Sequence, residues 1–218
     1  MGIKITCPVE KSVRFSILFL IAYSVIQLVG ILTPQSRHFF ELLIPVSIMI
    51  NLIILFSFHR PWDKLHILFF SGVALFSFLI EAFGANTGIL FGEFVYGETL
   101  FLKIFNTPVV IGFYWLLLVY GAVHLIRSIP SLRKFTPVIV GVVIVLFDFA
   151  LETVAMNTGM WTWIFNDIPL RNSAMWFVVS ASIASLFELL DIKTESKVAG
   201  VIFILQFISI AILCKFLG

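Results

Sequence analysis

Apolar residues dominate seven stretches of this chain, and short polar segments separate them. Each stretch is about 17–20 residues long, which is the length that an α-helix needs to cross the hydrocarbon layer of a membrane. We therefore predict an all-α fold, in which residues 1–218 form one polytopic domain of seven transmembrane helices. The predicted helices cover residues 15–32, 39–58, 66–83, 108–127, 136–155, 174–190 and 198–217.

One polar motif occurs twice, each time at the end of a predicted helix. Residues 81–88 and 152–159 both read Glu-x4-Asn-Thr-Gly, and each copy is followed by a proline seven residues before a tryptophan. The repeated order predicts an internal duplication of two helices, with units at about 66–127 and 137–190. Because each unit has an even number of crossings, the repeat would be parallel, with its axis along the membrane normal. The proline–tryptophan pairs are Pro108 with Trp115 and Pro169 with Trp176.

Composition and charge narrow the class of protein. Hydrophobic residues make up 61% of the chain and charged residues 12%, with a mean hydropathy of +1.11, which excludes a soluble globular domain. The net charge of +2 gives no indication of nucleic-acid binding. Ten Lys and Arg residues fall on the N-terminal side of the membrane and four on the other, so the N-terminus is predicted to be cytoplasmic and the C-terminus outside. Cys7 and Cys214 would lie on opposite faces, and no metal-binding motif is present.

Three carboxylates lie within the predicted helices, where a charged side chain costs about 2.5–3.5 kcal/mol. They are Glu81, Asp148 and Glu152, and Asp148 is one turn from Glu152 on the same helix face. We expect all three to act as catalytic groups in one cavity that opens outward, where burial and mutual repulsion would keep at least one of them protonated at neutral pH. In the alternative interpretation they cap a neighbouring helix or pair with Arg171 or Lys103.

Several other polar residues have simpler explanations. The glycines of the two motifs are expected to end their helices in the left-handed conformation. Asn86 and Asn157 could contribute to these helix ends, or could hold a water molecule beside the carboxylates. Asn51 and Gln206 lie in mid-membrane, and we expect them to form hydrogen bonds between helices.

Aromatic residues accompany the two motifs and are candidates for binding substrate. The loop over residues 87–107 is long and apolar and contains Tyr96, so it should lie at the membrane interface or fold back over the bundle as a lid. Trp161, in the second loop, fits either an interfacial aromatic belt or a pocket wall. Trp115 and Trp176 are either packing anchors or pocket walls, where an aromatic face can stabilise a cation.

These features together resemble a known family of membrane enzymes. The two acidic helix ends, the spacing Gly88-x3-Gly92-x3-Tyr96, and Pro108 followed by Trp115 are similar to the integral-membrane carotenoid biosynthesis family, which includes CruF-type carotenoid 1,2-hydratases and bisanhydrobacterioruberin hydratase. The resemblance covers the third to sixth predicted helices. It implies addition of water to the terminal double bond of an acyclic carotenoid, without a cofactor, in a bacterial or archaeal cytoplasmic membrane. Membrane lipid and other enzymes of the carotenoid pathway are the further partners that it implies.

The chemistry of the residues suits such a reaction. Protonation of a trisubstituted alkene needs an acid shielded from water, and the tertiary cation needs aromatic or anionic stabilisation. We hypothesise that Asp148 or Glu152 is the general acid and that Glu81 positions water or stabilises the cation. Asn86 and Asn157 would hold water. Two alternatives remain open: a carotenoid cyclase, which starts from the same protonation, and a membrane transporter or lipid-binding protein without catalysis.

Overall fold

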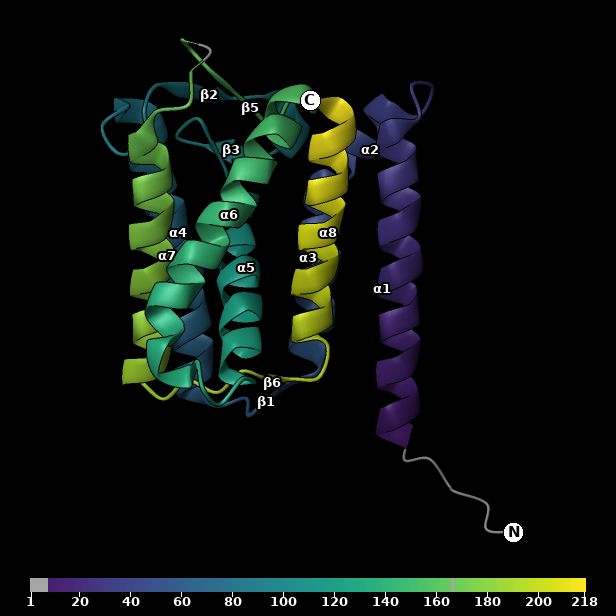
Figure 1. Ribbon diagram of the computed structural model, residues 1–218, viewed down its shortest axis with the longest axis vertical. Helices are drawn as coiled ribbons and strands as arrows, with labels where there is room; N and C mark the ends of the chain where they lie inside the picture. Colours follow the sequence, from purple (N-terminus) through teal and green to yellow (C-terminus); the bar gives the residue numbers. More distant parts are fainter. Residues whose placement is uncertain (1–7, 166) are drawn as a thin grey trace.

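Eight α-helices make up most of the described chain, and short β-ribbons lie at the ends of the bundle (Figure 1). This computed structural model describes residues 8–165 and 167–218, so Lys4 and Cys7, which entered the charge and cysteine arguments, lie outside the described residues. The prediction of an all-α fold is confirmed. The helices are α1 (Pro8–Leu32), α2 (Arg37–Leu42), α3 (Ile44–Ser57), α4 (Lys64–Thr87), α5 (Val110–Arg127), α6 (Thr136–Asn157), α7 (Leu170–Leu189) and α8 (Ala199–Leu217).

Six of the described helices are long and apolar enough to cross a membrane, as expected of an integral membrane protein. They are α1, α4, α5, α6, α7 and α8. The start of α1 and the end of α8 lie at opposite ends of the bundle (Figure 1).

The segment predicted as one helix over residues 39–58 takes a different form. α2 ends at Leu42, the chain turns at Leu43, and α3 follows. α3 has 14 residues and is therefore about 21 Å long. Pro45 lies in the first turn of α3, and because it lacks an N–H donor it cannot continue a helix from the preceding turn. α3 is shorter than the six long helices, and the count of seven crossings stays a prediction.

α5 is the most deeply buried of the six long helices. It packs against α3, α4, α6, α7 and α8, and its sequence is apolar on all sides, which is typical of a helix surrounded by others. Gly112 permits the close approach of α5 to α4, because a side chain at this position would collide with the backbone carbonyl of Ala74.

This close approach gives a prediction for stability. We expect Gly112→Ala to lower the melting temperature of the detergent-solubilised protein, because adding a methyl group to a tightly packed interface costs about 1–3 kcal/mol. Gly72 on α4 provides the matched control, since no atom lies within 4 Å of the place that its Cβ would occupy. Gly72→Ala should leave the melting temperature unchanged or raise it slightly. Equal melting of the two variants would contradict the packing of α4 against α5.

A β-ribbon joins the two loops that follow α4 and α6. β2 (Phe94–Tyr96) pairs antiparallel with β5 (Trp161–Trp163), so that Phe94 lies opposite Trp163 and Tyr96 opposite Trp161. In both strands the first and third residues are buried and the middle one is exposed, because successive side chains of a strand point to opposite faces. The loop over residues 87–107 thus folds back over the bundle, one of the two arrangements expected for it.

The remaining short elements complete the two ends of the bundle. β1 and β6 join the loops at the end where α1 begins, and β3 and β4 form a hairpin at the other end (Figure 1). Their bounds are β1 (His59–Arg60), β6 (Glu195–Ser196), β3 (Lys103–Ile104) and β4 (Thr107–Pro108), with 3₁₀ turns η1 (Glu98–Leu100) and η2 (Arg133–Phe135).

The glycines of the two motifs stand where α4 and α6 end. Gly88 and Gly159 have φ angles of 65° and 66°, in the left-handed region that residues other than glycine rarely adopt. The prediction that these glycines end their helices is confirmed.

Candidate active site

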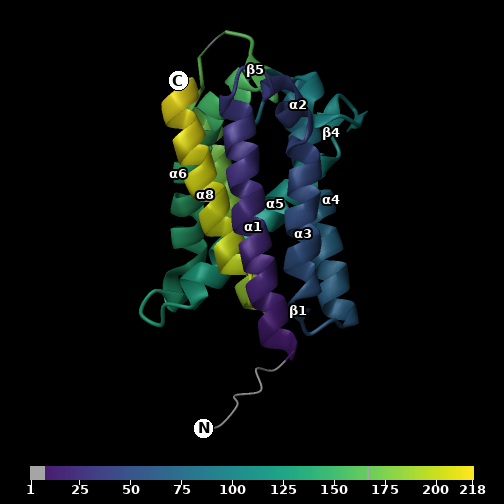
Figure 2. The same cartoon turned by 90° about the vertical axis from the view of Figure 1, so that its right-hand side faces the viewer.

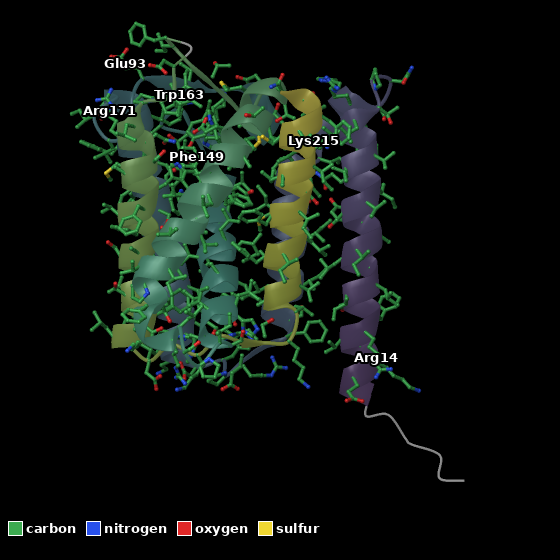
Figure 3. All side chains as sticks on the ribbon, viewed as in Figure 1. Arg14, Glu93, Phe149, Trp163, Arg171 and Lys215 are labelled. Atoms are coloured by element: carbon green, nitrogen blue, oxygen red, sulfur yellow. The ribbon has the colours of Figure 1, made fainter. Side chains whose placement is uncertain are left out.

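Three carboxyl side chains are buried near the end of the bundle that the β2–β5 ribbon covers. Glu81 on α4 is 4% exposed, and Asp148 and Glu152 on α6 are 0% and 2% exposed. Both helices lead toward the ribbon, since each is followed by one of its strands. Figure 3 shows Trp163 of β5 at the same end of the bundle as Arg171, with Arg14 at the opposite end.

Glu81 and Glu152 line one small cavity beneath the ribbon. The space in it that is open to the centre of a water molecule is about 20 Å³, enough to hold about one water. Asp148 does not line this cavity and is connected to it through Asn172. The rest of the wall is mostly aromatic and consists of Phe91, Phe94, Tyr96, Ile111, Trp161, Trp163, Asn172 and Trp176.

Each oxygen of the Glu81 carboxyl group accepts one hydrogen bond. The Tyr96 hydroxyl donates to Oε2 over 2.8 Å, and the Trp115 indole Nε1 donates to Oε1 over 2.8 Å. Burial raises the pKa of Tyr96 well above its usual value, so its hydroxyl keeps the proton that it donates. Glu81 is therefore held in one orientation by donors from β2 and α5.

Glu152 accepts three hydrogen bonds. Trp161 and Trp163 both donate from Nε1 to its Oε2, over 2.9 and 2.8 Å, and Asn172 donates from Nδ2 to its Oε1 over 3.0 Å. Residues two apart on a strand point to the same face, so β5 presents both indoles to one oxygen. The ribbon thus supplies donors to both glutamates: Tyr96 from one strand to Glu81, and two tryptophans from the other to Glu152.

Asp148 and Glu152 share a single amide group. The Asn172 Nδ2 atom donates to Asp148 Oδ2 as well as to Glu152 Oε1, in each case over 3.0 Å. The other oxygen of Asp148, Oδ1, is buried and has no hydrogen-bond partner among the described residues. A buried carboxylate oxygen without a hydrogen bond is costly, because its negative charge has no partner. A proton on Oδ1 would remove that charge and make the group a hydrogen-bond donor.

Neutral groups surround the three carboxyls. In the described part of the chain, no Lys or Arg forms an ion pair with any of them. Lys103 donates instead to Glu98 and to the backbone oxygen of Tyr96, and Arg171 is exposed at the start of α7 (Figure 3). The alternative prediction, in which the carboxyls form ion pairs with Lys103 or Arg171, is therefore wrong.

The sequence model of one protein family, described as "Carotenoid biosynthesis protein", matches residues 15–216. The chain belongs to the carotenoid biosynthesis protein family. The resemblance noted from the motifs is confirmed, and the match extends beyond the third to sixth predicted helices to nearly the whole chain. No curated protein and no solved structure matches the chain.

Two closely packed tryptophans lie beside the cavity of this carotenoid biosynthesis protein. The rings of Trp115 and Trp176 are 4.3 Å apart between centroids and 32° apart in plane, and Trp176 lines the cavity. Phe94 lies 5.1 Å from the ring of Tyr96 and 5.3 Å from that of Trp163. Aromatic faces of this kind exclude bulk water and can stabilise a cation.

The two asparagines expected to hold water lie outside the cavity. Asn86 and Asn157 are both exposed. Asn86 donates to the backbone oxygens of Ala82 and Phe105, each over 2.7 Å, and Asn157 donates to that of Thr153 over 2.9 Å. Each asparagine is five residues after its glutamate, which turns it about 140° around the helix from the carboxyl group. The structure therefore assigns the asparagines to the helix ends and loops.

Asn172 and Trp163 are members of the site that were not among the candidate residues taken from the sequence. Trp163 could have been predicted, because Trp161 and Trp163 are two residues apart and point to the same face if the segment is a strand. Asn172 is a polar residue in the first turn of a helix, where polar residues commonly serve only the helix end. Its role follows from the packing of α6 against α7, which no local pattern reveals.

Proposed function

We propose that this member of the carotenoid biosynthesis family adds water to the terminal C=C bond of an acyclic carotenoid end group. The observation that carries this proposal is the cavity itself, which Glu81 and Glu152 line and which has room for a water molecule. Asn172 joins Glu152 to Asp148, so that two carboxyls stand on one side of the site.

The first step is protonation of the alkene. Two neighbouring carboxylates repel each other in an apolar site, so the pair of Asp148 and Glu152 holds one proton, as paired acids do in other enzymes. This proton adds to the less substituted carbon of the terminal double bond, and the electron pair of the π-bond forms the new C–H bond. The positive charge is left on the tertiary carbon. The unpaired Oδ1 of Asp148 marks a place where the pair can store the proton.

The second step is capture of the cation by water. Glu81, fixed by Tyr96 and Trp115, provides a negative charge near the cation and an acceptor for a hydrogen of the attacking water. The water oxygen bonds to the tertiary carbon, and the proton that it releases returns to the acid pair. The sum is alkene plus water giving a tertiary alcohol, and the reaction as written needs no redox equivalent.

The aromatic wall assists both steps. Trp176, Phe91 and Phe94 line the cavity in which the cation would form, and aromatic rings can stabilise such a charge. The space for about one water molecule is smaller than a carotenoid end group, so binding of the substrate requires the cavity to widen. A carotenoid is as apolar as the membrane and can reach the site from within the bilayer.

The finer topology belongs to the same proposal. The chain would cross the membrane seven times, with a cytoplasmic N-terminus and a parallel two-helix repeat over about 66–127 and 137–190. Each unit would contribute one glutamate and one strand of the ribbon. The opposite placement of the start of α1 and the end of α8 supports this topology (Figure 1).

Pigment analysis tests the proposed reaction. In a host that accumulates lycopene or a longer acyclic carotenoid, expression of the chain should give a product heavier by one water, detected by chromatography and mass spectrometry. A product of unchanged mass with altered absorption would identify a cyclase, in which an internal alkene captures the cation. Unchanged pigment with several acyclic substrates would reject both enzymes and favour a transporter or binding protein.

A further inference from the structure

A second and larger cavity lies between α1, α3 and α8, against α5 and α6. Its space open to the centre of a water molecule is about 80 Å³, compared with 20 Å³ in the acid cavity. It is close to the acid cavity but separate from it, since Tyr114 lines one and its neighbour Trp115 holds Glu81 of the other. The reaction proposed above makes no use of this second cavity.

Uncharged polar side chains line this cavity within a membrane-spanning bundle. Three of its residues, Asn51, Tyr114 and Ser47, are more than nine-tenths buried. Asn51 donates to the backbone oxygen of Ser47 in its own helix, which leaves its side-chain oxygen free, in contrast to the hydrogen bond between helices that we expected. The other polar lining residues are Ser24, Gln27, Gln206 and Ser209.

Three of these polar side chains have no hydrogen-bond partner within the described part of the protein. Among the described residues, the Tyr114 hydroxyl and the side-chain amides of Gln27 and Gln206 form no hydrogen bond, although all three line the cavity. Polar groups in a membrane are normally bonded to a neighbouring helix, because leaving them unpaired costs free energy. Three helices that each contribute such groups to one cavity indicate a ligand with hydrogen-bonding atoms of its own.

The lining also restricts the chemistry of that ligand. The described residues that line it include no Asp, Glu, Lys, Arg or His, so they offer no partner for a phosphate or another charged headgroup. It offers both donors and acceptors, which suit a hydroxyl group. The remaining wall is aliphatic and suits the apolar chain that such a hydroxyl group would terminate, and α1, which lies between α8 and α3 in Figure 2, forms one side of it.

We propose that the cavity between α1, α3 and α8 is an intramembrane binding site for the hydroxyl-bearing end of a long, uncharged isoprenoid, and that its ligand is the hydrated carotenoid. The identity of the ligand rests on the proposed function; the existence of a hydroxyl-binding site does not. The two cavities lie in the same half of the bundle, because Leu151 lines one and the adjacent Glu152 lines the other. The enzyme can therefore hold its alcohol product away from the acids that would dehydrate it.

A binding experiment with ready-made pigments tests this site without relying on catalysis. The protein in lipid nanodiscs is titrated with a monohydroxylated acyclic carotenoid and, separately, with the parent hydrocarbon, and the pigment that remains with the protein is measured by absorbance. The hydroxylated pigment should bind at least about tenfold more tightly, as expected for one or two added hydrogen bonds. Tyr114→Phe and Gln206→Leu should each reduce this preference several-fold without changing the affinity for the hydrocarbon.

Ser185→Ala is the control, because Ser185 on α7 bonds to its own helix and lines neither cavity. Equal binding of the two pigments by the unmodified protein would overturn the proposal, and so would a preference that survives both cavity variants. Failure of the proposed function gives a different result. A chain that binds the hydroxylated pigment through Tyr114 and Gln206 but yields no heavier product in the host keeps this site and loses the hydratase activity.

Discussion

Replacing Glu152 by Gln should lower the formation of hydrated carotenoid by about 10²–10⁴-fold, the range that a general acid contributes. The substitution keeps the size of the side chain, and its oxygen can still accept from the indoles of Trp161 and Trp163. It removes the carboxyl group of the acid pair that faces the cavity, so no proton can be delivered to the alkene. The amount of product heavier by one water, relative to the substrate pigment, measures the effect in the expression host.

Glu98→Gln is the matched control for this experiment. Glu98 lies at the same end of the bundle, its side chain is 94% exposed, and it contacts Lys103 rather than the cavity. This variant should form product at the rate of the unmodified protein. Glu152→Gln must also reach the membrane in equal amount and keep its melting temperature in detergent. A folded Glu152→Gln protein with more than half of the normal activity would remove Glu152 from the mechanism.

The helices were predictable because their signal is local. An apolar run of about 20 residues can be satisfied in only one way within a membrane, since its backbone must bond to itself. The three buried carboxyls were found for a related reason, because a charged residue at such a position is too costly to be incidental. The break between α2 and α3 follows from Pro45, which is local too, but the apolar run continues through it and hides it.

The partners of the carboxyls were not predictable in the same way. The pairing of β2 with β5 joins segments more than 60 residues apart, and this pairing places Trp163 beside Glu152 and Tyr96 beside Glu81. Asn172 reaches both acids of α6 only because α7 packs against it. The partners of polar side chains between helices could not be predicted either. Asn51 could form a hydrogen bond with another helix or face a cavity, and only the packing of the helices decides which.

The pairing of Asp148 with Glu152 gives the second prediction with a large expected effect. Asp148→Asn should also lower hydration by about 10²–10⁴-fold, although Asp148 does not line the cavity, because the proton available to Glu152 is shared with it. Asp191→Asn, at an exposed aspartate bound to Lys193, serves as the control and should keep full activity. Product mass and amount are measured as for Glu152→Gln.

The double variant distinguishes a shared proton from two independent contributions. If the pair holds one proton, combining Asp148→Asn with Glu152→Gln should cost no more activity than the more severe single change, because either change already removes the acid. Independent roles would instead multiply the two losses. Full activity in a folded Asp148→Asn protein would show that Glu152 acts alone, and the shared amide of Asn172 would then serve only to orient it. The three pigment ratios, compared with both controls, therefore distinguish a proton shared by the pair from a proton that Glu152 delivers alone.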